Sequence, residues 1–242
     1  MSPEPTGELE VMSFWEHLDA LRSTLLFLLA AAGVAACGAW FISQQVLDAL
    51  VTPGLEKVYF SNPSEGFMIR MKVSGVIGLL AVLPIVLARL WSFVAPGLFR
   101  HEKRAVVPVL VSGSILFYVG TAFGYFLVVP RMVSFFMSFS GEKMSPLINV
   151  TEYFMFVAKF SLAFGLAFQL PLVIVLLAAL GIMTPKQLWK QWRYGVVVIW
   201  ILSAWLTPPD AGSQIMMGVP LTVLYLLSIG LAFVVARRRQ HR

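Results

Sequence analysis

The chain has 242 residues, of which 59% are hydrophobic and 12% are charged. A soluble domain carries about a quarter charged residues, so this composition indicates a membrane protein. Within a lipid bilayer, only helices and closed barrels form all their backbone hydrogen bonds internally. The net charge of +6 would suggest nucleic acid in a soluble protein. Here the basic residues lie between apolar runs, and membrane topology explains them better.

Six apolar segments follow one another along the chain, at residues 23–43, 70–92, 105–130, 153–180, 194–206 and 212–235. A helix needs about 20 apolar residues to cross the hydrocarbon core, and the first four segments are long enough. The fifth spans only roughly 20 Å as a helix. Pro220 interrupts the sixth segment, so its regular helix can be short as well. We therefore predict an all-α polytopic membrane protein with six transmembrane helices in a single domain, residues 1–242.

The basic residues between these segments are distributed unequally, and cytoplasmic loops are the ones enriched in lysine and arginine. One side holds eleven of them: Arg22, Arg100, Lys103, Arg104, Lys186, Lys190, Arg193, Arg237, Arg238, Arg239 and Arg242. The other side holds three: Lys57, Arg131 and Lys143. The sequence therefore predicts a multi-pass protein of a bacterial inner (plasma) membrane with both termini in the cytoplasm.

The loops on the opposite side cover residues 44–69, 131–152 and 207–211. The first is long enough to hold a short interfacial helix around Gln44–Leu50. Asn149-Val150-Thr151 matches a glycosylation sequon, which we interpret as a chance match. The chain has no visible internal repeat, so the inverted-repeat architecture of many transporters has no support here.

Catalytic and metal-binding arrangements are not visible in the sequence. Serine-protease chemistry needs a histidine near the nucleophile and aspartyl-protease chemistry needs paired acids inside the membrane, whereas the histidines and aspartates lie outside the apolar segments or at their ends: His17, His101, His241, Asp19, Asp48 and Asp210. A zinc site needs clustered ligands, and the single cysteine, Cys37, also excludes a disulfide within the chain. We expect neither an enzyme, nor a cofactor, nor a metal site.

The fourth apolar segment carries two polar side chains, Lys159 and Gln169. Intramembrane polar groups are functional candidates by default, and Pro171 removes a backbone hydrogen bond near Gln169. Two interpretations of Gln169 stay open: it donates to a freed carbonyl or a neighbouring helix, or it faces a cavity and contacts a ligand. Lys159 can reach the membrane surface by extending its side chain along the helix.

Charged residues also gather on the predicted cytoplasmic side, before the first segment and after the second: Glu16, Asp19, Arg22, Glu102, Lys103 and Arg104. Charges at helix ends are commonly solvated anchors. Two acidic groups beside adjacent helix ends can instead accept a pair of guanidinium groups in forked geometry. In the third segment, Gly120 and Gly124 form a small-xxx-small pair that favours close helix packing within the chain.

Four motifs in this order resemble the TatC family, the multispanning core of the twin-arginine protein translocase, from about Phe14 to Phe233. They are Glu16-His-Leu-Asp-Ala-Leu-Arg22, Phe93-Val-Ala-Pro-Gly-Leu-Phe-Arg-His-Glu-Lys-Arg104, Ala163-Phe-Gly-Leu-Ala-Phe-Gln-Leu-Pro171 and Leu206-Thr-Pro-Pro-Asp-Ala-Gly-Ser-Gln214. The second and fourth are highly specific. The resemblance implies a receptor and translocase core that works with small single-span TatA- and TatB-like partners, in a larger complex with further copies of itself. It also implies export of folded proteins driven by the proton motive force.

The resemblance also implies roles for individual residues. Glu102 is the chief contact for the paired arginines of a signal peptide, and Phe93, Pro96, Leu98 and Lys103 belong to the same motif. Glu16, Asp19 and Arg22 contribute the amino-terminal side of the site, and Gln169 lies along the path of the peptide's apolar stretch. Pro171, Pro208 and Asp210 take structural or translocation roles, and we expect Asp210 to cap the sixth helix.

The chain departs from the family pattern at two positions, Ala20 and Gln169, where the family usually has glutamate. Asp19 or Glu16 can substitute for the first acid with altered geometry. Gln169 keeps a hydrogen-bonding group but no ionisable one, which costs less in hydrocarbon than a carboxylate. On the residues alone, Lys159 and Gln169 also leave a small-solute secondary transporter as the alternative function.

Overall fold

The computed structural model describes residues 14–50, 58–94, 106–141, 147–179 and 181–240, and these are helical apart from short connections. The elements are α1 (Phe14–Ala39), η1 (Trp40–Ile42), α2 (Ser43–Leu50), α3 (Glu65–Val94), α4 (Val106–Phe123), the π-helical turn η4 (Gly124–Val128), α5 (Val129–Met137), α6 (Val150–Ala167), α7 (Leu170–Ala179), α8 (Pro185–Lys190), α9 (Trp192–Leu206) and α10 (Ala211–Gln240). The predicted all-α class is confirmed, and α2 occupies the place of the short helix expected around Gln44–Leu50.

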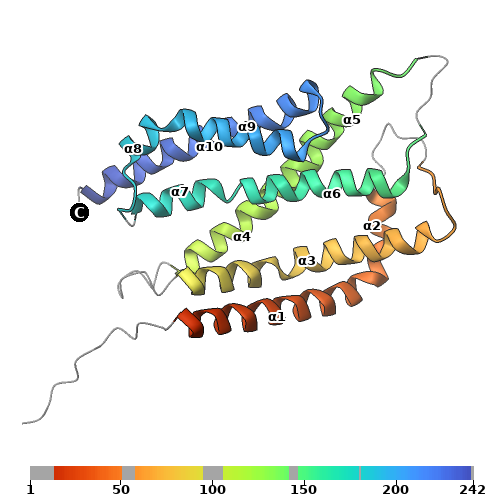
Figure 1. Ribbon diagram of the computed structural model, residues 1–242, viewed down its shortest axis with the longest axis horizontal. Helices are drawn as coiled ribbons and strands as arrows, with labels where there is room; N and C mark the ends of the chain where they lie inside the picture. The colour runs from red at the N-terminus through yellow and green to blue at the C-terminus, as the bar shows by residue number, and fades with distance from the viewer. Residues whose placement is uncertain (1–13, 51–57, 95–105, 142–146, 180, 241–242) are drawn as a thin grey trace, which may run out of the picture.

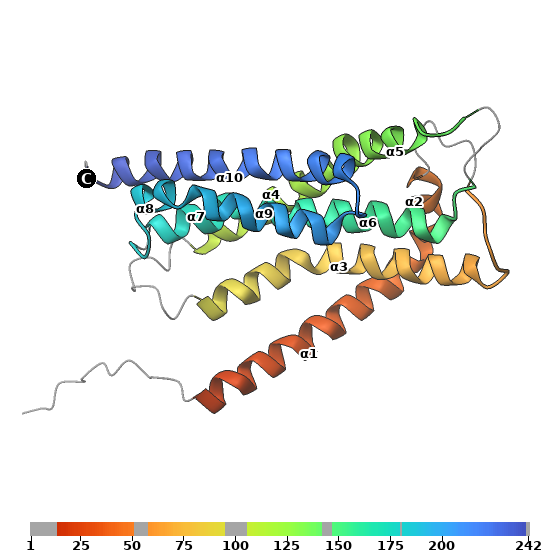
Figure 2. The same ribbon diagram turned by 45° about the horizontal axis from the view of Figure 1, so that its top comes forward.

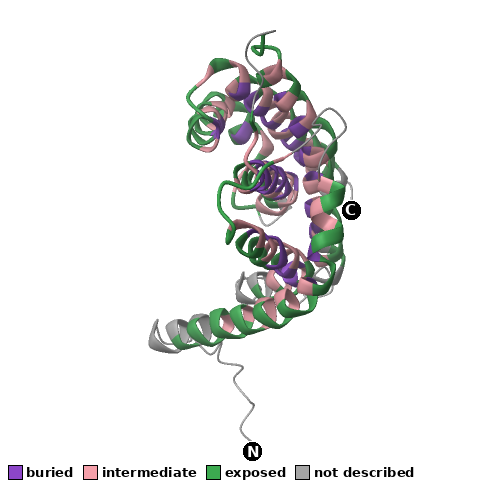
Figure 3. Ribbon diagram, turned by 90° about the vertical axis from the view of Figure 1, so that its right-hand side faces the viewer, coloured by how far each residue is buried: buried purple, intermediate pink, exposed green. Residues whose placement is uncertain are grey.

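The helices run lengthwise and form a curved arc when seen end-on, with α1 at one edge and the α9–α10 pair at the other (Figures 1 and 3). We call the end at which α1 begins and α10 ends the terminal end, and the opposite end the distal end. The carboxyl end of α3, the start of α4 and the α7–α8 connection also lie at the terminal end (Figure 1). Within the described residues, five helical stretches are long and apolar enough to cross a membrane, and α9 is a shorter apolar helix.

Helix α9 is short, as the sequence predicts, whereas α10 is not. The 15 residues of α9 rise about 22 Å. The turn that joins α9 to α10 stops short of the level at which α3 and α6 begin (Figures 1 and 2). Helix α10 continues for 30 residues through Pro220. The expectation of a shortened sixth helix is therefore wrong, because a membrane helix tolerates a proline when neighbouring helices and side chains cover the freed backbone.

Helix α3 passes through Pro84 in the same way, and here the compensating group is visible. Proline has no N–H and leaves the carbonyl four residues earlier without its helical partner, which in α3 is Leu80. The hydroxyl of Tyr118 on α4 donates to the Leu80 carbonyl at 2.8 Å. A side chain from a neighbouring helix thus replaces the missing backbone donor.

Glycines bring α4 and the start of η4 into close contact with α6, as the small-xxx-small pair predicts. A Cβ atom at Gly120 would lie 2.6 Å from the carbonyl oxygen of Phe164, and one at Gly124 would lie 3.0 Å from the Cα of Ser161. Facing them on α6, a Cβ atom at Gly165 would lie 2.9 Å from the ring of Phe117. Small side chains let the two backbones approach, so this pair serves packing within the chain.

A polar connection joins two loops at the distal end. Tyr59 exchanges backbone hydrogen bonds with Ile148 and Val150, at 2.9 and 3.0 Å. Asn149 accepts from the N–H groups of Thr151 and Glu152, which caps α6, while its amide donates to Ser61 at 2.7 Å. The Asn149 side chain thus joins the start of α6 to the loop that contains Ser61.

Candidate functional site

Two of the predicted recognition residues lie on helix ends at the terminal end (Figure 1). Glu16 lies in the first turn of α1, and Phe93 lies in the last turn of α3. The remaining members of the second motif lie outside the described residues, between Val94 and Val106: Pro96, Leu98, Glu102 and Lys103. The structure describes the elements around that segment in the sequence and at the same end: the start of α1, the last turn of α3 and the start of α4. We call these three the frame.

Helix α1 supplies two exposed charges to this frame, Asp19 and Arg22. They are three residues apart and therefore lie on one face of the helix. Two contacts hold α1 against α3. A Cβ atom at Gly78 would lie 2.6 Å from the backbone nitrogen of Ala36, and the guanidinium of Arg89 stacks 4.8 Å from the ring centroid of Phe27. These contacts hold the middle and second half of α1 against α3, whereas the start of α1 diverges from α3 toward the terminal end (Figure 2).

Gln169 forms a hydrogen bond with a neighbouring helix. It lies at the break between α6 and α7, half-buried, and its amide donates to the carbonyl of Gly113 on α4 at 2.9 Å. Pro171 is buried in the first turn of α7, and the helical pattern resumes with Val173 N–H donating to the Gln169 carbonyl at 3.0 Å. Of the two interpretations of Gln169, the structure shows the helix-to-helix bond.

Lys159 is exposed on α6 and pairs with no acid among the described side chains. It lies nine residues after Val150, which is about 13 Å along the helix. Such a lysine can extend toward the membrane surface. This placement does not bring Lys159 and Gln169 into one described polar site.

The fourth motif forms the turn between α9 and α10. The carboxylate of Asp210 accepts from the N–H of Ser213 at 2.7 Å and from the Ser213 hydroxyl at 2.5 Å, so Asp210 caps α10 as predicted. Pro208 is exposed and lines a small cavity of about 260 Å³ near Glu152 and Phe156. These residues shape the loop between two helices.

One cluster was not singled out from the sequence. Arg70, within α3, stacks 4.6 Å from the ring centroid of Trp40, donates to the Ser43 hydroxyl at 3.1 Å and to the Trp40 carbonyl at 3.4 Å. It thereby satisfies backbone where α1 passes through η1 into α2. An arginine at the end of an apolar run indicates that its guanidinium has a hydrogen-bonding partner, but the sequence does not identify that partner.

The described helices define a class: a multi-pass membrane protein, in whose described part no three His, Cys, Asp or Glu residues could hold a metal ion. A family model described as Sec-independent protein translocase protein (TatC) matches residues 16–220. The chain belongs to the TatC family.

Curated relatives support this membership over nearly the whole chain. A TatC protein of Desulforapulum autotrophicum is 37% identical over 228 residues, which are 92% of this chain and 84% of that protein. A TatC protein of Aquifex aeolicus is 32% identical over 236 residues, or 95% and 98% of the two chains. A crystal structure of the twin-arginine translocase receptor TatC superposes with a TM-score of 0.81 at 32% identity, covering 91% of this chain and 99% of that one.

Membership settles the general function. The protein is a component of the Sec-independent, twin-arginine protein translocase and works within that complex as a receptor-type subunit, not as a catalytic enzyme. The sequence-based prediction of family and function is therefore confirmed.

Proposed function

We propose that this chain binds paired-arginine signal peptides of folded proteins at the terminal end, and that Glu102 is the chief acceptor for the two guanidinium groups. The observation that supports this proposal is the frame: the start of α1 and the ends of α3 and α4 that flank residues 95–105 lie at one end of the bundle (Figure 1). Asp19 and Arg22 are exposed on α1, which begins at the same end (Figure 1). Guanidinium groups bind carboxylates in forked pairs.

The terminal end also concentrates positive charge, which supports a cytoplasmic location for both termini. Lys186, Lys190, Arg193 and Arg237 lie on or beside elements of this end, whereas Arg131 is on α5 toward the distal end. Cytoplasmic loops are enriched in basic residues. We therefore propose that the terminal end faces the cytoplasm of a bacterium, where signal peptides first meet the inner membrane.

The other roles follow from the same proposal. Glu16, Asp19 and Arg22 form the amino-terminal side of the peptide site, and Phe93, Pro96, Leu98 and Lys103 shape the segment around Glu102. The peptide's apolar stretch then runs along the bundle toward Gln169. Small single-span TatA- and TatB-like proteins and further copies of this chain complete the complex, and the proton motive force drives transport.

Affinity for matched peptides tests the proposal. A signal peptide with Arg-Arg is compared with the same peptide carrying Lys-Lys, using the purified full chain and a Glu102→Ala variant. Loss of one desolvated charge partner costs about 2–5 kcal/mol, so the variant should bind the Arg-Arg peptide at least roughly 30-fold more weakly. Glu152→Ala is the matched control, because Glu152 is an exposed acid at the start of α6, at the distal end.

Two results would contradict the assignment. Equal binding of the Arg-Arg and Lys-Lys peptides would show that guanidinium geometry is not recognised. Equal losses in Glu102→Ala and Glu152→Ala would show that net charge, and not the segment between α3 and α4, controls binding.

A further inference from the structure

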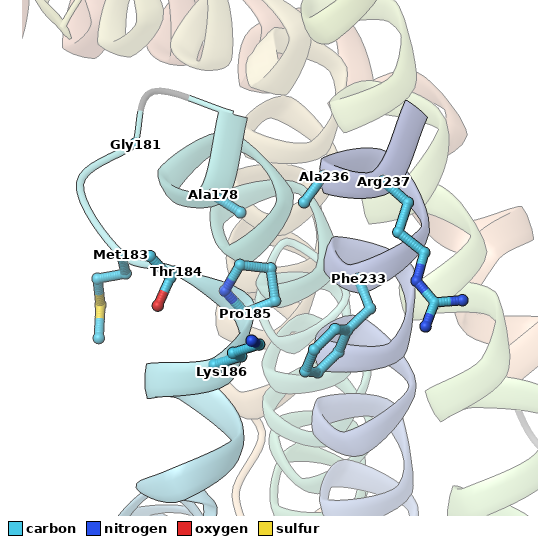
Figure 4. A pocket seen from close by; sticks show the side chains of 9 residues that line it. All are labelled: Ala178, Gly181, Met183, Thr184, Pro185, Lys186, Phe233, Ala236 and Arg237. Carbon is cyan, nitrogen blue, oxygen red and sulfur yellow. The ribbon is translucent and has the colours of Figure 1, made fainter. Parts of the chain in front are cut away.

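A cavity at the terminal end lies between the α7–α8 turn and the last turns of α10. Its volume is about 640 Å³. Figure 4 shows the Phe233 ring and Lys186 facing the space between the turn and α10, while Arg237, which also lines the cavity, leaves the next turn of that helix on the side away from Lys186. The walls are thus partly apolar and partly cationic.

Local geometry fixes the wall formed by the turn. Gly181 adopts a left-handed conformation with φ of 73°, which suits glycine at the end of a helix, and Ile182 N–H donates to the Leu177 carbonyl at 3.1 Å. Thr184 then opens α8 with a reciprocal capping box to Gln187. The cavity is therefore bordered by a defined turn rather than by an extended loop.

The charge around the cavity is one-sided. Between Glu152 and Asp210, and again after Asp210, the sequence contains no acid. Asp210 itself precedes α10, about 40 Å from Arg237 along the helix. In the sequence, segment 95–105 carries Glu102 together with three basic residues. An anion entering the cavity would meet Lys186 and Arg237 and no acid from α7, α8 or α10.

Aromatic side chains beside the cavity indicate that it lies at the depth of lipid headgroups. Trp189 on α8 and Tyr194 at the start of α9 are exposed, and Trp192 lies between them. Tryptophan and tyrosine are enriched at the membrane–water boundary. Basic pockets between helices at this level on the cytoplasmic side accept anionic headgroups, and the apolar lining by Phe233, Met183 and Ala236 suits the adjoining glycerol and acyl carbons.

We propose that this cavity binds one anionic phospholipid, with its phosphate near Lys186 and Arg237 and its upper acyl chain against Phe233. Both cations are exposed, so they retain the freedom to close on a phosphate. The bound lipid would fill the space between the α7–α8 turn and α10. This role is independent of Glu102 and of signal-peptide binding.

The test counts lipids retained by the purified, delipidated chain in native mass spectrometry, after titration with phosphatidylglycerol or phosphatidylcholine. The full chain should hold one phosphatidylglycerol in preference to phosphatidylcholine. A Lys186→Gln, Arg237→Gln double variant should bind it roughly 30-fold more weakly, because each basic residue at the surface contributes about fivefold. The matched control is Lys190→Gln with Arg193→Gln, which removes the same charge from the same end but from outside the cavity lining.

A second variant separates the cavity from the charge. Ala236→Trp fills the space while keeping both cations and should also lose the lipid. Equal losses in the two double variants, or full retention in Ala236→Trp, would overturn the proposal in favour of diffuse attraction to a basic surface. Displacement of phosphatidylglycerol by millimolar glycerol phosphate would overturn the lipid assignment in favour of a free-phosphate site.

Discussion

Helices α1 and α6 are about equally apolar, yet they have very different surroundings. In the most apolar stretch that includes α1, 6% of the residues are buried, against 28% in the stretch formed by α6 and α7. Helix α1 lies at one edge of the arc (Figures 1 and 3) and packs chiefly along α3. Helix α6 contacts α3, α4, η4 and α5. Hydropathy thus indicates that a helix can lie in lipid, but it does not indicate which helices pack against it.

Small residues at contact points account for much of the difference. Gly33 on α1 has no atom within 4 Å of the position of a Cβ, whereas Gly120 on α4 directly faces the backbone of α6. Without a hydrophobic force between helices in lipid, association depends on close packing and hydrogen bonds. Glycine therefore determines packing only where a partner helix comes close.

The largest effect is expected from Gly120→Val. Its side chain would meet the Phe164 carbonyl and the Phe168 side chain, and overpacking of this kind costs about 1–3 kcal/mol. Gly33→Val is the matched control and should change the free energy of unfolding by less than about 0.5 kcal/mol. Equilibrium unfolding in mixed detergent micelles measures both. Similar losses in the two variants would show that glycine acts through helix propensity and not through packing.

The starts of the two helices differ as well. Helix α6 begins at Asn149, whose side chain caps two N–H groups and donates to Ser61. The described charges in the first turns of α1, Asp19 and Arg22, are exposed. The start of α6 is therefore held by hydrogen bonds to the first distal loop, and this difference can be tested directly.

Asn149→Ala should cost about 1–2 kcal/mol because the cap is lost. Asn149→Asp keeps the acceptor for the cap but loses the donor to Ser61, so its cost should be about half as large. Hydrogen exchange at the amides of Thr151 and Glu152 should accelerate in the alanine variant and stay near the parent rate in the aspartate variant. Equal acceleration in both would assign the effect to the bond with Ser61.

Several elements could be predicted because their signals are local. Apolar runs of sufficient length indicated the helices, the spacing of Gly120 and Gly124 indicated close packing, and Asp210 before a helix indicated a cap. The motif around Glu102 identified the candidate site through family resemblance, because the residues alone also permitted plain anchoring of the helix ends.

Other features depend on contacts between distant parts of the chain. The sequence left open whether Gln169 faces a ligand or a helix, since its partner, Gly113, is 56 residues away. The sequence did not predict that α10 continues through Pro220, because a proline in the sequence indicates a break in the helix. Whether the helix continues depends on neighbouring groups that hydrogen-bond to the freed backbone. The partners of Arg70 are likewise set by the way α1 turns into α2 beside α3.

The smallest effect concerns a single hydroxyl group between α3 and α4. Tyr118→Phe removes the donor to the Leu80 carbonyl that Pro84 leaves free, and such bonds contribute about 0.6 kcal/mol in membrane proteins. Tyr194→Phe, at an exposed position on α9, should have no measurable effect. Pro84→Ala restores a backbone N–H for Leu80, so Tyr118→Phe should cost less in that background. A double-mutant cycle without coupling between the two positions would show that the hydroxyl does not compensate for the proline.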